Sequence, residues 1–193
     1  MQEKIGEIIG YTLFGIFLLL KPHILEWFKR KKRNLAKSSE VITKGDNLCY
    51  YLQGDLKATR VNVWQFGNGD ESFLGFSFKY CSMVLEATRE DQVSLRNQSQ
   101  KIPIYDYVTS LNFLKRSDNG IAVYKTEETR GSNLYYRLTS LGIAQCIECQ
   151  LNPHKIDSGI LSICFDTEEE ITEEHLAEVK RIAHQILTLL KNN

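Results

Sequence analysis

IAQCIECQLNPHKIDSGILSICFD, residues 143–166, decides the fold class of this chain. Its two ends, residues 143–151 and 159–165, are rich in β-branched and apolar residues, which predicts two strands. The segment between them, Asn152-Pro153-His154-Lys155, is typical of a turn. The two strands are therefore expected to pair as an antiparallel hairpin.

A long amphipathic helix is expected after this hairpin. Thr172 suits its N-cap, and Glu173 and Glu174 complement the positive end of the helix dipole. Apolar residues then recur in steps of three and four, with two more widening the stripe: Leu176, Val179, Ile182, Ala183, Ile186, Leu189 and Leu190. Such a stripe predicts packing on the sheet, and pairing with a second copy of the helix is the alternative.

A second hairpin is expected nearer the N-terminus. Residues 59–67, TRVNVWQFG, and 73–88, FLGFSFKYCSMVLEAT, have the composition of strands, and a glycine-rich turn at 67–70 separates them. Residues 34–57 precede this hairpin and are predicted to form a connecting helix. Gly45-Asp46-Asn47 weakens the middle of that helix and can break it.

The segment between the two hairpins is expected to be mixed. Residues 104–114 are predicted to be helical, 120–126 a short strand and 129–132 a loop. Ser132 suits the N-cap of a helix that runs through Leu141. Strands joined by tight turns, with helices gathered at the ends, predict an α+β domain with an antiparallel sheet of about five strands and flanking helices.

An apolar segment precedes this domain. Residues 5–28, IGEIIGYTLFGIFLLLKPHILEWF, predict one transmembrane helix, and the basic run KRKKR at 29–33 places the carboxyl side in the cytoplasm. The alternatives are an interfacial amphipathic helix, a buried core helix or a cleaved signal. Pro22 can end or kink the span. The expected organisation is an anchor with a basic stop at 1–33, a connecting helix at 34–57 and a cytoplasmic domain at 58–193.

Composition argues against several classes of function. The net charge is zero although the anchor end is strongly basic, so the remainder is mildly acidic and unsuited to binding nucleic acid. The five cysteines are irregularly spaced, which fits a reducing cytoplasm better than a disulfide framework. Cys146 and Cys149 lie three apart on a predicted strand and should point to opposite faces, and the four histidines lack metal-type spacing. We therefore expect no metal, no cofactor and no catalytic residue.

Residues 40–192 resemble a GAF domain, the small sensor fold related to PAS. The resemblance rests on the strand at 159–166 and on a last helix that contains Ile182-Ala183-His184-Gln185-Ile186. RVNVWQFGNG at 60–69 resembles the opening strand and turn of the family, with Gly67 where some members carry a histidine. The chain departs from the family in lacking the signature of the cyclic-nucleotide-binding group, and no chromophore-attachment cysteine or haem histidine can be matched.

The resemblance implies a ligand pocket between the sheet and the segments that cover one of its faces. Aromatic residues on the predicted strands and on the short helix are the candidate ligand-binding residues: Trp64, Phe66, Phe76, Phe78, Tyr80, Tyr135 and Tyr136. Ordinary core packing of these rings is the alternative.

The expected function is a single-pass, membrane-anchored, cytoplasmic GAF-like module that binds a ligand or signals without an effector domain of its own. A homodimer or a partner protein would carry its signal. The alternative is a pocketless adaptor for protein–protein contacts at the membrane, an architecture that would suit a phage or mobile element. A thiol-dependent small-molecule reductase is a third hypothesis, because some GAF-fold proteins resemble this one in size.

Overall fold

The computed structural model describes residues 38–68, 78–153 and 158–191 of the chain. The chain divides into two compact units, residues 1–40 and 41–193, and the second contains the folded domain. The expected transmembrane segment at 5–28 lies outside the described residues. Across the described ranges, no helix combines the length and the apolar character that a membrane span requires.

The domain is built on a six-stranded sheet in the order β3-β2-β1-β6-β5-β4, and every neighbouring pair is antiparallel. The strands run as follows: β1 Arg60–Asn68, β2 Phe78–Thr88, β3 Ile102–Pro103, β4 Ile121–Lys125, β5 Gln145–Gln150 and β6 Ile160–Phe165. Both predicted hairpins, β1–β2 and β5–β6, are confirmed. The central pair β1–β6 joins the two hairpins, so the middle of the sheet comes from segments far apart in sequence.

The remaining elements are helical. A helix described over residues 38–55 precedes β1. The others are η1 Ile104–Tyr107, α2 Val108–Arg116, η2 Thr126–Thr129, α3 Asn133–Ser140 and α4 Glu173–Lys191. Both predicted caps are present: Ser132 Oγ accepts from the Tyr135 N–H (3.2 Å), and Thr172 Oγ1 accepts from the His175 N–H (3.2 Å). These caps satisfy amide groups that a helix start leaves unpaired.

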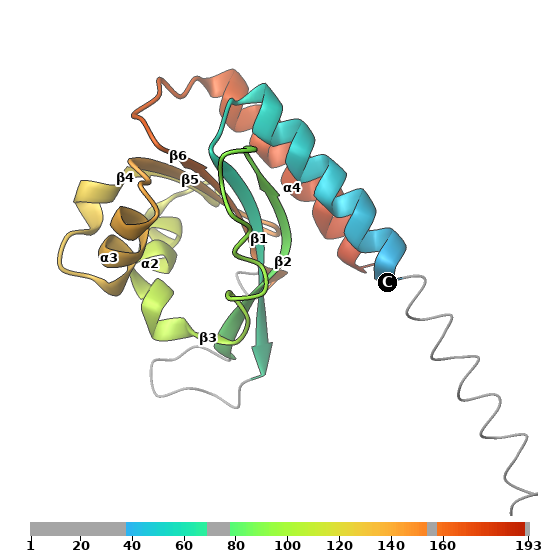
Figure 1. Ribbon diagram of the computed structural model, residues 1–193, viewed down its shortest axis with the longest axis horizontal. Helices are drawn as coiled ribbons and strands as arrows, with labels where there is room; N and C mark the ends of the chain where they lie inside the picture. The colour runs from blue at the N-terminus through green and yellow to red at the C-terminus, as the bar shows by residue number, and fades with distance from the viewer. Residues whose placement is uncertain (1–37, 69–77, 154–157, 192–193) are drawn as a thin grey trace, which may run out of the picture. The chain divides into compact units, whose positions relative to one another are not determined.

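One face of the sheet is covered by the 38–55 helix and α4, which lie side by side (Figure 1). We call it the two-helix face. Leu52 of the first helix and Val179 and Ile186 of α4 are fully buried there against Val61 and Ile163 of the sheet. The apolar stripe predicted on α4 is thus used in packing within this domain. Burying each such side chain contributes about 1.5–3 kcal/mol relative to exposing it.

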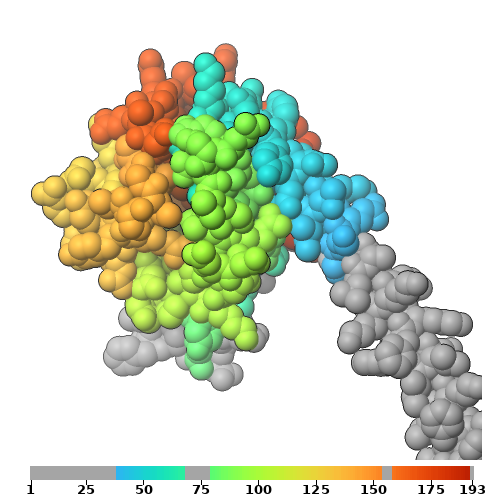
Figure 2. Space-filling model, viewed as in Figure 1, coloured from blue at the N-terminus to red at the C-terminus, as the bar shows by residue number. Residues whose placement is uncertain are grey.

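The opposite face is covered by η1, α2 and α3, and we call it the α2/α3 face. Its core includes Trp64, Met83 and Leu111, and a second cluster around Tyr124 and Leu138. In the space-filling view, the green segment that follows β2 lies against the orange segment that contains α3 (Figure 2). Both faces of the sheet are therefore covered, which is the layer arrangement of an α/β/α sandwich.

Several local predictions were wrong. Residues 89–103, expected from their polar composition to be a loop, contribute a sixth strand, because Ile102 and Pro103 pair with β2. Residues 126–129 form the short helix η2. The 38–55 helix is continuous through Gly45, where a Cβ would lie only 2.5 Å from Leu85 Cδ1. Gly45 is thus a point of close approach between helix and sheet, and its cost in helix propensity is tolerated there.

Candidate functional site

Polar side chains cross the α2/α3 face in two transverse rows, set by the strand register. Glu86, Asn62, Ser162 and Glu148 are partnered in turn across β2, β1, β6 and β5. Arg60, Cys164, Cys146 and Tyr124 form the next row across β1, β6, β5 and β4. All eight are buried, because α3 and the segment after β2 cover this face. A buried polar strip of this kind is costly unless its members find partners.

Arg60 and Glu86 supply the main charge pairing of the strip. Their Nη1 and Oε1 atoms lie 2.5 Å apart, and each side chain is only 3% exposed. Glu86 also accepts from the Leu95 N–H (3.0 Å) and the Ser94 hydroxyl (2.5 Å). Burial opposes ionisation of Glu86, but these hydrogen bonds and the Arg60 guanidinium together lower the pKa of its carboxyl. Glu86 is therefore a buried carboxylate that ties the 94–96 loop to the sheet.

Glu148 is a buried carboxyl of the opposite kind. Burial raises its pKa to about 7, and a hydrogen bond from the Ser110 hydroxyl of α2 only partly offsets that effect. In the described residues no ion pair is formed by Glu148. A carboxyl with a pKa near 7 can change its protonation state when the polarity of its surroundings changes.

The two rows line a small, partly open cavity of about 30 Å³. Its polar lining groups come from the rows and from the covering elements: Arg60, Asn62, Tyr107, Tyr124, Arg137, Cys146, Glu148, Ser162 and Cys164. Asn62 Oδ1, the Tyr107 hydroxyl and Arg60 Nε are buried and find no hydrogen-bond partner among the residues that the structure describes. The Tyr124 hydroxyl lies near Glu148 but also lacks a partner in hydrogen-bonding geometry. Buried polar groups are normally paired, so a polar molecule in this cavity could supply the hydrogen bonds that these groups lack.

Arg137 of α3 covers one side of this cavity. Its guanidinium lies 5.3 Å from the ring centroids of both Trp64 and Tyr107, within the range of cation–π contact. Its Nη2 donates to Ser99 Oγ at 3.0 Å, which joins α3 to the segment after β2. Arg137 is therefore both part of the cavity lining and a contact that holds α3 over it.

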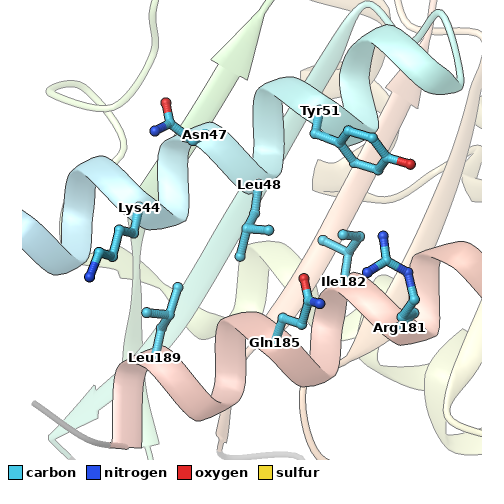
Figure 3. Close-up of a pocket in the computed structure, with 8 residues that line it drawn as sticks. All are labelled: Lys44, Asn47, Leu48, Tyr51, Arg181, Ile182, Gln185 and Leu189. Carbon is cyan, nitrogen blue, oxygen red and sulfur yellow. The ribbon is translucent and has the colours of Figure 1, made fainter.

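A second hollow lies on the surface between the 38–55 helix and α4 (Figure 3). We call it the two-helix groove. Its volume is about 570 Å³, and its lining alternates polar and apolar residues: Lys44, Asn47, Leu48, Tyr51, Arg181, Ile182, Gln185 and Leu189. Leu48 and Leu189 point toward each other across the groove in Figure 3. Tyr51 lies over Arg181, with 5.9 Å between the ring centroid and the guanidinium carbon.

The seven predicted ligand-binding residues fall in different places. Trp64 lines the cavity of the α2/α3 face. Phe66 and Tyr80 line a separate shallow surface pocket on β1 and β2, of about 260 Å³. Tyr135 and Tyr136 lie on α3 outside both sites, with Tyr136 68% exposed. Phe76 lies outside the described residues, and Phe78 begins β2. The structure thus brings one of the seven to the cavity.

The polar cavity residues were missed at the level of sequence. Their signal was the alternation of polar and apolar residues in Arg60-Val61-Asn62-Val63 and in Leu161-Ser162-Ile163-Cys164. Alternation of this kind usually marks a strand with one solvated face. The predicted opposite orientation of Cys146 and Cys149 is confirmed, because Cys146 belongs to the α2/α3 face and Cys149 to the two-helix face. In the ranges 38–68, 78–153 and 158–191, no cluster of three or more histidine, cysteine or acidic residues could hold a metal ion.

Comparison with solved structures defines the class of fold. The PixJ GAF domain of Thermosynechococcus elongatus matches with a TM-score of 0.61 and 14% identity, over 82% of this chain and 89% of that one. A phycoerythrobilin-bound GAF domain from a cyanobacterial phytochrome matches equally well, at 0.61 and 14%, over 84% and 91%. A domain of a two-component sensor histidine kinase protein from Sinorhizobium meliloti gives 0.52 and 14%, over 80% and 90%.

The chain therefore has the fold of GAF domains, as its sequence resemblance predicted. No family model matches the chain, and no curated protein matches it. Identities near 14% establish the shared fold and leave function to be argued from the sites.

Proposed function

We propose that residues 41–191 form a sensor module that binds a small polar molecule in the cavity on the α2/α3 face. The observation that carries this proposal is the convergence on one small cavity of buried polar atoms that have no partner in the described structure, among them Asn62 Oδ1 and the Tyr107 hydroxyl. A buried polar atom without a partner costs about 1–3 kcal/mol. A molecule that supplied those partners would stabilise the domain by a comparable amount.

The size and chemistry of the cavity limit the ligand. About 30 Å³ accommodates one or two water-sized molecules, since each needs at least roughly 10–15 Å³. Asn62 Oδ1 offers an acceptor, whereas Arg60 Nε and the two tyrosine hydroxyls offer donors. The expected ligand therefore has a few non-hydrogen atoms and both donor and acceptor groups. The solved GAF domains bound to phycoerythrobilin and phycocyanobilin carry a molecule far larger than this cavity could hold.

Thermal unfolding of the full chain in detergent tests this proposal. The probes are small amides, amidines, carboxylic acids and alcohols, each measured with the wild type and with Asn62→Leu, which removes an acceptor from the cavity. A ligand at about 100 times its Kd should add about 2.7 kcal/mol to the free energy of unfolding of the wild type. Asn47→Leu, in the two-helix groove, should respond like the wild type. If no probe stabilises the wild type more than Asn62→Leu, the proposal fails.

The two-helix groove favours a second candidate function, an adaptor that pairs with a second copy of the chain. Its apolar floor, with Leu48 and Leu189, is bordered by the ring of Tyr51, which is 52% exposed. Exposed apolar surface that gathers around a groove is typical of an association site. Two copies related by a two-fold axis would each cover the groove of the other, so no further protein is required.

Sedimentation equilibrium of the full chain in detergent tests the adaptor function. Leu189→Glu places a charge in the groove and should weaken self-association at least about tenfold, which corresponds to 1.4 kcal/mol. Tyr136→Glu, on an exposed position of α3 outside the groove, is the matched control. A dimer that Leu189→Glu leaves intact would show that the groove is not the interface. It would point instead to the predicted span at 5–28, where Gly6 and Gly10 form a G-x-x-x-G motif of the kind that lets two membrane helices approach closely.

We further propose that residues 5–28 anchor the domain to a membrane, that residues 34–193 lie in the cytoplasm, and that the module is not an enzyme. The uncharged run at 8–20 and the basic run at 29–33 support this placement. A reporter that functions only in the cytoplasm should be active when it is fused after Asn193. Activity of a reporter that requires export would contradict the topology.

A further inference from the structure

Cys146 and Cys164 face each other across β5 and β6. They are direct partners in the antiparallel register, and their Sγ atoms lie 3.8 Å apart. Both are unoxidised and buried among Tyr124, Leu134 and Leu138. The other buried cysteine of β5, Cys149, points to the two-helix face and has no such partner in the described structure.

The hydrogen-bond pattern of the sheet makes this pair suitable for a disulfide. Leu151 N donates to Gly159 O, and on the other edge of β5 Gln150 N donates to Gly120 O. The backbone groups of odd-numbered β5 residues therefore form hydrogen bonds with β6, and those of even-numbered residues form hydrogen bonds with β4. Cys146 and Cys164 thus form a non-hydrogen-bonded pair, whose Cα atoms lie about 4.5 Å apart in antiparallel sheets. Disulfides span Cα separations of roughly 4.4–6.8 Å, so a bond needs little movement of the strands.

The local chemistry favours ionisation of one thiol. The Cys146 S–H donates toward Cys164 Sγ, and this hydrogen bond lowers the pKa of the Cys164 thiol. A contact with the Ser162 hydroxyl lowers that pKa further, whereas burial acts in the opposite direction. The same bond holds the proton of Cys146 and raises the pKa of that thiol. The thiolate is the nucleophilic form of cysteine. In the reaction proposed for this pair, Cys164 is the attacking sulfur and Cys146 the resolving one.

Access to the pair comes through the partly open cavity, which both thiols line. Its volume of about 30 Å³ admits a molecule with two oxygen atoms and excludes a protein disulfide or glutathione. The oxidant that fits is hydrogen peroxide, a neutral molecule with donors and acceptors for the unpartnered groups around it.

We propose that Cys146 and Cys164 form a peroxide-reactive dithiol, which hydrogen peroxide converts to a cross-strand disulfide between β5 and β6. The Cys164 thiolate attacks one oxygen, so that an S–O bond forms and the O–O bond breaks. The departing hydroxide takes up the proton that the Cys164 thiol released and leaves as water. The Cys146 sulfur then attacks the sulfenic sulfur, the S–S bond forms, and the second hydroxide leaves as water with the Cys146 proton. Two thiols lose two electrons to one peroxide, which becomes two waters.

The dithiol lines the same cavity as the proposed ligand site, but its reaction needs only the thiol pair and room for peroxide. A domain that is stabilised by a probe but forms no disulfide would support the proposed function alone. A domain that forms the disulfide but is stabilised by no probe would support only the dithiol.

Peptide mapping without reductant tests the proposal on the full chain in detergent. After reduction, removal of the reductant and addition of one equivalent of hydrogen peroxide, we expect a mass lower by two hydrogen atoms and a link between the tryptic peptides 138–155 and 156–180. Dithiothreitol should reverse both changes. Cys149→Ser removes the other cysteine of the first peptide and should leave the link intact, whereas Cys146→Ser should abolish it.

Three results would overturn the proposal. The first is a folded wild type, shown by an unchanged melting transition, that forms no link. The second is a link that is lost in Cys149→Ser, which would assign the bond to the other thiol. The third is oxidation of Cys164 to the sulfinic acid in the wild type while Cys146 stays reduced. Because all three are read on the wild type or on Cys149→Ser, instability of Cys146→Ser cannot obscure the outcome.

Discussion

Arg60 and Glu86 form an ion pair in the interior of the domain, with 2.5 Å between Nη1 and Oε1 and 3% exposure of each side chain. Arg60 also donates to Val93 O (2.9 Å), and the Glu86 carboxylate accepts a hydrogen bond from the Leu95 N–H. The pair thus joins β1, β2 and the segment that leads toward α2. Because that segment covers the cavity, the ion pair contributes to the site as well as to stability.

Breaking this pair should be costly. Arg60→Met leaves Glu86 buried without its cation, and we expect a loss of about 3–5 kcal/mol in the free energy of unfolding, measured with urea. The control is Arg89→Met, because Arg89 is 39% exposed and pairs with Asp91 and Asp166 at the surface. Such pairs contribute about 0–1 kcal/mol. Equal losses in the two variants would show that burial of the Arg60 pair has no energetic consequence.

Glu148 should make stability depend on pH. Its pKa in the folded state, about 7, lies above the ordinary value of 4.5, so the native state holds the proton more tightly than the unfolded chain. The free energy of unfolding should therefore fall as pH rises from about 4.5 to 7, by about 3 kcal/mol in total. Glu148→Gln keeps an acceptor for Ser110 and removes the titration.

Urea unfolding at several pH values from acid to neutral tests this expectation. The wild type and Glu148→Gln should differ little at low pH, and the variant should become the more stable protein above neutrality. Parallel pH profiles for the two proteins would contradict the assignment of the raised pKa to Glu148.

Gly45 should resist replacement even though it lies inside a helix. An added Cβ would meet Leu85 Cδ1 at 2.5 Å, so Gly45→Ala should cost about 1–3 kcal/mol through overpacking. That loss exceeds the roughly 1 kcal/mol that alanine gains in helix propensity. Gly54→Ala is the matched control in the same helix, with nothing within 4 Å of the new Cβ, and should be neutral or stabilising. A double variant with Leu85→Ala should relieve the clash, and failure to do so would argue against this contact.

Gly159 should be the least replaceable glycine of the sheet. Its φ of +118° is unfavourable for other residues, and a Cβ would lie 2.5 Å from the Trp64 carbonyl oxygen. We expect Gly159→Ala to cost about 3 kcal/mol or more, since backbone strain and a backbone clash combine. Gly131 has a φ of +85° and nothing within 4 Å of an added Cβ, so Gly131→Ala should show the strain alone. Thermal melts compare the two, and equal losses would mean that the approach of Trp64 is unimportant.

The sequence was sufficient for the elements whose signals are local. The hairpins β1–β2 and β5–β6, the N-caps Ser132 and Thr172, and the opposite orientation of Cys146 and Cys149 were all predicted. Each depends on residues close together in the chain, where turn chemistry, capping and a period of two act directly. The resemblance to GAF domains added the correct fold.

The candidate sites depended on contacts between distant segments. Polar alternation in β1 and β6 is compatible with a solvated face, and only the packing of α3 over Asn62 and Ser162 makes it a buried polar cavity. Cys146 and Cys164 carry no shared motif, and only the register of β5 on β6 brings their sulfurs together. The sequence by itself thus determined the strands, turns and caps of this protein. The tertiary structure decided which of their side chains are covered and which meet, because burial and register are properties of the whole sheet.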